Sequence, residues 1–136
     1  MCQSFFAVFK KQPVTIEEFV QGEFHKYVNN NGFHIPSTSV EFDEVYEKAQ
    51  CLVHHSYQIS EKKLMLLDVQ GSFFKLYVPE IATTDLLVND ASLDSNKVNF
   101  CAGNFPVLQF YEFNSKHSCN KYCDMMSLKV FDENGI

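Results

Sequence analysis

The feature that most constrains this chain is the run H-S-C-N-K-Y-C near its C-terminus, which contains His117, Cys119 and Cys123. Cysteine and histidine are the usual ligands of tetrahedral zinc. On a helix, the two cysteines would lie one turn apart on the same face. A fourth ligand is available at either His54 or His55. The alternative is a helix that packs both cysteines inward without a metal, because H-x-C-x3-C is not one of the common zinc-finger patterns.

Length and composition predict one folded domain, residues 1–136. The chain is 46% hydrophobic and has 14 phenylalanines, which excludes a disordered polymer. Its net charge of −6 argues against a nucleic-acid partner, because such partners are polyanions. No stretch is long and apolar enough to suggest a membrane span. The cysteine count is odd, at five, and no signal-peptide pattern is present, so we expect an intracellular, cytoplasmic protein with reduced thiols.

Local patterns predict the elements of the first half of the chain. Residues 5–9 are apolar and β-prone, and Pro13 should end that strand, with a further strand or linker over 14–20. The run Asn29 to Gly32 is a strong turn signal. Thr38 and Glu41 have the form of a capping box, and apolar residues then recur at helical spacing. The sequence therefore predicts a helix over residues 40–54.

The second half should begin with a hairpin. Its strands are predicted at residues 56–60 and 64–69, and the second strand should be central because it is apolar on both faces. Residues 79–99 are polar and predict a long loop. A helix should start near Pro106, with Asn104 near its cap, and a last helix should cover residues 119–128. The first of these helices should turn four side chains inward, namely Val107, Phe110, Tyr111 and Phe113.

Asp68 closes the second strand of the predicted hairpin. A carboxylate at the end of a buried strand is unusual, because burying a charge is costly unless the charge is paired or binds a metal. One interpretation is a functional carboxylate. The other is that the strand has already reached the surface, so that Asp68 faces water.

Three blocks of the sequence together resemble the alpha-type (atypical) protein serine/threonine kinase family. Residues 14–33 are similar to the family's hinge and the entry to its C-terminal lobe. Residues 54–71, ending L-M-L-L-D-V-Q-G, resemble the family's block in which a histidine is followed by a hairpin and then by the motif D-I-Q-G. Residues 100–130 resemble the F-G-x-x-N loop and the closing H-x-C-N-x3-C. The resemblance implies an α+β fold, the C-terminal lobe of an alpha-type kinase, with a small antiparallel sheet and helices stapled by zinc.

The resemblance also implies roles for individual residues. By position, the zinc ligands would be His54, His117, Cys119 and Cys123, and the aspartate assigned to catalysis would be Asp68. Gln70 corresponds to a magnesium-binding glutamine. Four further positions would approach the nucleotide: Gly103 and Asn104 in the glycine-rich loop, and Glu17 and Phe19 at the hinge. Zinc would be structural, since four protein ligands leave no open coordination position, and Mg-ATP would be the second cofactor.

The chain departs from the family pattern in ways that bear on activity. Val78 stands where the family has a second metal-binding aspartate, and valine offers no oxygen to magnesium. Cys101 and Pro106 replace loop glycines. The family's N-terminal lobe is expected to be largely missing. We therefore expect a kinase homologue that is truncated and inactive or weak by itself, or alternatively a zinc-stabilised, pseudokinase-like binding module. Either should need a protein partner, a missing lobe or a second copy to cover the apolar surface within residues 5–20.

Overall fold

The computed structural model of the protein describes residues 4–37, 39–77, 79–83 and 108–131. Seven strands occur in this part of the chain: β1 (Ser4–Phe9), β2 (Gln12–Glu17), β3 (His25–Lys26), β4 (Leu64–Leu67), β5 (Gln70–Ser72), β6 (Lys75–Leu76) and β7 (Glu80–Thr83). Three helices accompany them: α1 (Val40–Ile59), α2 (Leu108–Lys116) and α3 (Lys121–Met125). The strands form three small antiparallel sheets, β1-β2, β3-β5-β6 and β4-β7, so the α+β class is confirmed. No helix in these ranges has the length and apolarity that crossing a bilayer requires.

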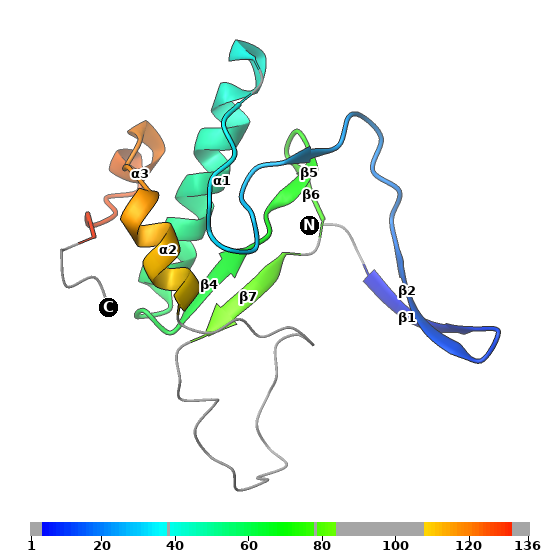
Figure 1. Ribbon diagram of the computed structural model, residues 1–136. Coiled ribbons are helices and arrows are strands. Elements are labelled where there is room, and N and C mark those ends of the chain that lie inside the picture. The colour runs from blue at the N-terminus through cyan, green and yellow to red at the C-terminus, as the bar shows by residue number, and fades with distance from the viewer. Residues whose placement is uncertain (1–3, 38, 78, 84–107, 132–136) are drawn as a thin grey trace, which may run out of the picture.

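The core lies between α1 and the β4-β7 pair, and α2, beside α1 in Figure 1, adds Phe110 and Phe113 to the same cluster. Side chains four residues apart on α1 form its buried stripe, and they are Val45, Ala49, Val53 and Tyr57. On β4 the alternate residues Met65 and Leu67 are fully buried. Burying each large apolar side chain contributes roughly 1.5–3 kcal/mol. The buried stripe of α1 therefore forms one side of the core.

Helix α1 runs five residues beyond its predicted end, and the predicted strand over residues 56–60 is wrong. Its last turn is held by tertiary contacts, since the Tyr57 ring packs edge-on against Phe110 with centroids 5.3 Å apart. The Ser56 hydroxyl donates to the Val53 carbonyl (2.7 Å) and accepts from the Leu66 amide (2.9 Å). These contacts outweigh the weak β-pattern of S-Y-Q-I-S, because propensity is readily overridden by packing.

Strand β4 is confirmed, but two predictions about it are wrong: that it pairs with residues 56–60, and that it is central in its sheet. It pairs antiparallel with β7, at residues 80–83, where the sequence predicted loop. Within the described ranges β4 has this single partner, so it is not a central strand. Its side chains alternate between partly and fully buried, one face lying on α1.

The N-terminal residues form a hairpin that projects from the rest of the molecule (Figure 1). Strand β1 is confirmed, whereas Pro13 lies inside β2, opposite Val8, and does not end a strand. An open edge strand tolerates proline, because no ladder donor is needed there. The turn over residues 29–32 is confirmed: the Gly32 amide donates to the Asn29 carbonyl (3.1 Å), and Gly32 has φ +80°. Helix α1 begins after Ser39, whose side chain makes no capping bond; Thr38 lies outside the described residues.

Helix α2 confirms part of the predicted inward face. Phe110 and Phe113 are buried, but Tyr111 is 53% exposed, because it lies on the opposite side of the helix. Val107, Asn104 and Pro106 lie outside the described residues. Helix α3 is shorter than the predicted 119–128. Its N-cap is Asn120, whose Oδ1 accepts from the Tyr122 and Cys123 amides, so Cys119 precedes the helix.

Gly71 in β5 yields a stability prediction. A Cβ atom there would overlap the Lys75 carbonyl oxygen and crowd Leu76, both backbone groups of the facing strand β6. We expect Gly71→Ala to lower the free energy of unfolding by about 2 kcal/mol or more, because the hairpin must shift to make room. Urea unfolding measures the loss. Ser115→Ala, an exposed change in α2, is the control; equal midpoints for both variants would contradict the prediction.

Candidate functional site

Four metal-ligating side chains meet at one point between α1, the end of α2 and α3. His54, His117, Cys119 and Cys123 place one ligand atom each within 4.8 Å of all the others. Cys119 Sγ lies 3.8 Å from His54 Nδ1, and Cys123 Sγ lies 3.6 Å from His117 Nε2. In a tetrahedral zinc site the bond lengths imply a sulfur–nitrogen separation of about 3.6 Å. The cluster therefore has nearly the dimensions that an ion would need.

Local structure fixes the segment that carries three of these residues. The His117 amide donates to the Phe113 carbonyl (2.8 Å), and the two rings stack at 4.7 Å, so His117 continues the last turn of α2. Asn120 caps α3, and its Nδ2 donates to the Glu47 carbonyl of α1 (2.9 Å). The ligand segment is thus attached to the rest of the protein independently of any metal.

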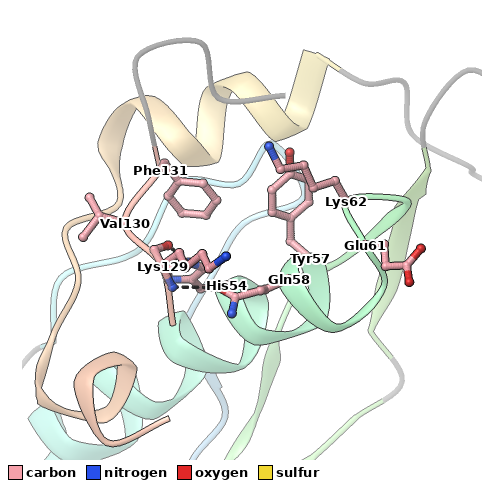
Figure 2. A pocket seen from close by; sticks show the side chains of 8 residues that line it. All are labelled: His54, Tyr57, Gln58, Glu61, Lys62, Lys129, Val130 and Phe131. Atoms are coloured by element: carbon pink, nitrogen blue, oxygen red, sulfur yellow. Dashed lines mark hydrogen bonds between the residues drawn. The ribbon is translucent and has the colours of Figure 1, made fainter. Parts of the chain in front are cut away.

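His54 is oriented by its second ring nitrogen. Its Nε2 lies 3.0 Å from the Lys129 carbonyl oxygen, the bond drawn in Figure 2, which leaves Nδ1 for the cluster. Metal-binding histidines commonly donate their other N–H to a carbonyl in this way, which sets the tautomer. The Lys129 amide in turn donates to Gln58 Oε1 (2.8 Å). Residues 129–131 therefore lie across the end of α1, where they line a pocket of about 380 Å³.

Burial controls the protonation of the cluster. Desolvation lowers the pKa of His54, and it lowers the pKa of His117 to about 4, with a smaller contribution from the neighbouring His54. Both imidazoles are therefore neutral near pH 7, which is the form that binds metal. Burial also raises the pKa of the Cys119 thiol, and the adjacent Cys123 adds to that rise. A metal must therefore displace a thiol proton in order to bind.

This protonation pattern predicts that zinc affinity rises with pH. Between pH 7 and 8 the histidines are already neutral, whereas the Cys119 thiol, with its raised pKa, still holds its proton. Each thiol proton released should strengthen apparent binding about tenfold per pH unit. Competition with a chromophoric chelator of known pH dependence measures the slope. An affinity independent of pH over this range would contradict thiolate coordination.

The donor set fits zinc in chemical terms. Two sulfurs and two imidazole nitrogens suit a borderline-soft ion in tetrahedral geometry, and four protein ligands describe a closed, structural centre. His55, the alternative fourth ligand, lies outside the cluster. Cys51 on α1 also lies outside the four-ligand set, and its side chain is buried. Desolvation raises the pKa of Cys51 to about 12, and the neighbouring cysteines add to the rise.

Asp68 lies at the kink between β4 and β5 and does not simply face water. Its side chain is 14% exposed, and its carboxylate pairs with Lys26 Nζ at 2.5 Å. Its backbone has φ +53°, in the left-handed region that is uncommon for residues other than glycine. Such backbone is found in turns, where aspartate adopts it more readily than most residues, and also at functional positions. The interpretation of Asp68 as a surface-facing residue is therefore wrong.

Sequence reasoning missed two neighbours of Asp68. Lys26 comes from β3, and Glu80 comes from the start of β7, opposite Leu67. Burial raises the pKa of Glu80, the Asp68 charge raises it further, and Lys26 opposes both effects. No local pattern could indicate this group, because its three members come from strands that are distant in sequence.

The other predicted nucleotide-site residues are only partly placed. Gln70 begins β5 opposite Lys26, next to the Asp68 group. Glu17 and Phe19 lie where the projecting hairpin joins the rest of the molecule, and both are exposed, Phe19 by 83%. Gly103 and Asn104, with the substituted positions Val78, Cys101 and Pro106, lie outside the described residues. Their predicted roles stay predictions.

Comparisons with known proteins agree with the resemblance in the sequence. Transient receptor potential cation channel subfamily M member 6 of Mus musculus is 30% identical over 123 residues, which are 90% of this chain and 6% of that protein. Myosin heavy chain kinase B of Dictyostelium discoideum is 31% identical over 113 residues, 83% of this chain and 13% of that protein. The chain thus spans a small fraction of these relatives.

Solved structures place the fold in the same family. The apoenzyme alpha-kinase domain of myosin-II heavy chain kinase A superposes with a TM-score of 0.66 at 27% identity, over 88% of this chain and 41% of that chain. A variant of the myosin heavy chain kinase A catalytic domain gives a TM-score of 0.73 at 24% identity, over 95% and 45%, which supports the fold alone. The sequence model of the alpha-kinase family matches residues 4–123. This chain belongs to the alpha-kinase family.

Proposed function

We propose that this chain supplies the lower, metal-stapled part of an alpha-type protein serine/threonine kinase site, which transfers phosphoryl groups from ATP to protein hydroxyls. Membership of the family supports a kinase-type function. The observation that carries the finer proposal is the Asp68 group, in which a mostly buried carboxylate is held by Lys26 on a strained backbone. Phosphoryl transfer needs such a group to orient the attacking hydroxyl, together with metal ions and cationic groups around the phosphates.

We propose further that the chain alone turns over ATP weakly or not at all. It covers 41% of the solved kinase-domain chain, so a complete nucleotide cleft would draw on other residues. Val78, at a position where the family uses a carboxylate, would weaken magnesium binding. The alternative function is a zinc-stabilised protein-binding module without chemistry. The described metal cluster serves either function, because its role is to hold α1 and α3 together.

The projecting hairpin supports the proposal of a protein partner. One face of β1 and β2 carries Phe5, Phe9 and Ile16, which are 59%, 62% and 55% exposed. Alternate residues of a strand share a face, so these side chains form one apolar surface. We propose that the rest of a kinase domain covers it, because this chain matches less than half of the solved domains. Sedimentation as a clean monomer at high concentration would exclude the other occupant, a second copy.

Calorimetric titration of the zinc-loaded chain with Mg-ATP tests the function. The kinase proposal predicts saturable binding in the millimolar range or tighter, and binding that weakens when Gln70 is changed to alanine. Gln109→Ala is the matched control, since it removes the same type of amide side chain from α2, away from the Asp68 group. Absence of heat at millimolar nucleotide would leave the binding module as the better description.

A further inference from the structure

The pocket at the C-terminal end of α1 has no part in the proposed phosphoryl transfer. Figure 2 shows it between the last turns of α1 and residues 129–131. Its volume is about 380 Å³, and small-molecule sites in proteins are roughly 300–1,000 Å³. None of the residues that line it belongs to the Asp68 group, so it is a separate site.

Hydrogen bonds fix the backbone on both sides of the pocket. On the side of α1, the Lys62 amide donates to the Tyr57 carbonyl (2.9 Å), and Lys62 has φ +67°, so the chain turns sharply after the helix. On the other side, the Lys129 amide donates to Gln58 Oε1 (2.8 Å), and the Lys129 carbonyl oxygen lies 3.0 Å from His54 Nε2. The pocket is therefore preformed, which lowers the entropy cost of binding.

One wall of the pocket is aromatic. The Phe131 ring packs against the rings of His54 and Tyr57, with centroid distances of 4.3 and 5.6 Å. Val130 adds an aliphatic side chain that is 77% exposed. Ring faces stack on other rings and bury large apolar areas, so such a wall favours a flat apolar molecule.

The charged side chains around the pocket favour an anion. Lys62 and Lys129 line it, and neither ammonium group has an ion-pair partner among the described residues. The acidic side chain at its edge, Glu61, lies 3.1 Å from Lys63 Nζ, and Figure 2 shows its carboxylate directed away from Phe131. Lysine side chains lay their stems along apolar surface and keep their charged ends in water. Two cationic groups can therefore reach an anion at the mouth of the pocket.

We propose that this pocket binds a small aromatic anion, such as an aryl carboxylate, with its ring against Tyr57 and Phe131 and its charge between Lys62 and Lys129. A pocket of this size encloses a small molecule, whereas a stable protein partner needs a much larger contact area. The proposal goes beyond the kinase function and does not depend on it.

Titration of the isotope-labelled full chain with 2-naphthoate, followed by two-dimensional NMR, tests the proposal. We expect saturable shifts at the amides of residues 54–62 and 129–131, which border the pocket. Neutral 2-naphthamide has the same ring system and should bind about tenfold more weakly, because it lacks the charge that the lysines attract.

Lysine variants separate the pocket from general charge attraction. Lys62→Met combined with Lys129→Met keeps the apolar stems and removes both ammonium groups. This variant should bind 2-naphthoate about tenfold more weakly and 2-naphthamide as wild type does. Lys10→Met combined with Lys11→Met is the matched control, since it changes the net charge equally at the exposed turn between β1 and β2. The control should bind both compounds as wild type does.

Several outcomes would overturn the proposal. They are no saturable binding, equal affinity for the two compounds in wild type, equal losses in the two double variants, or shifts confined to the β1-β2 hairpin or the Asp68 group. The same spectra report whether each variant is folded. Should the Lys62 and Lys129 variant fail to fold, Val130→Glu replaces it, because it adds a negative charge at an exposed lining residue. It should weaken 2-naphthoate more than 2-naphthamide, and equal effects would again overturn the proposal.

Discussion

Replacement of His54 by alanine should strip the metal from this chain and destabilise the packing of α3 on α1. His54 is 1% exposed and lies 3.8 Å from Cys119 Sγ, so the substitution removes a ligand from the centre of the cluster. Structural zinc contributes about 10–16 kcal/mol of binding free energy in small zinc domains, and that free energy acts as folding free energy. We expect a loss of about 4 kcal/mol or more in unfolding free energy at saturating zinc.

The adjacent histidine provides a matched control. His55→Ala removes the same side chain one position along α1, outside the four-ligand set. It should keep one zinc per chain by elemental analysis and melt within a few degrees of wild type. Chelation should lower the melting temperature of wild type and His55→Ala and leave His54→Ala unchanged. Equal zinc content in the two variants would remove the case for His54 as a ligand.

The second large effect is expected at Asp68. In a chimera in which this chain replaces the matching part of the myosin heavy chain kinase B kinase domain, Asp68→Asn should reduce phosphorylation of protein serine and threonine by about 10²- to 10⁴-fold. The amide keeps the shape of the side chain but cannot accept a proton. Loss of its charge also frees Lys26, so melting curves must show that the chimera stays folded.

Glu80→Gln is the control for Asp68. It removes the other carboxylate of the same group, whose charge is already disfavoured because burial and Asp68 raise its pKa. Its effect on the rate should be small. If both variants lose activity equally, the group acts through its summed charge and not through Asp68. An active Asp68→Asn chimera would contradict the catalytic role.

The candidate site was predictable where its residues are close together in sequence. His117, Cys119 and Cys123 lie in one short run, and their chemistry made a metal site one of two interpretations before the family resemblance favoured it. The buried face of α1 was predictable too, because helical spacing is a local property. The C-terminal end of α1 was not predictable. Its last turn is stabilised by contacts of Tyr57 with Phe110 and of Ser56 with Leu66, and both partners lie outside the helix.

The sequence by itself determined the family, because its motifs are residue types at short, fixed spacings, and the resemblance implied the α+β class and all four metal-ligand positions. Without the resemblance His54 and His55 were equivalent; in the structure the folded helix directs the first into the cluster. The tertiary structure likewise decided that β4 pairs with β7, and that Lys26 and Glu80 lie beside Asp68. These contacts join distant strands, and their geometry is set by how the core packs, which no local pattern specifies.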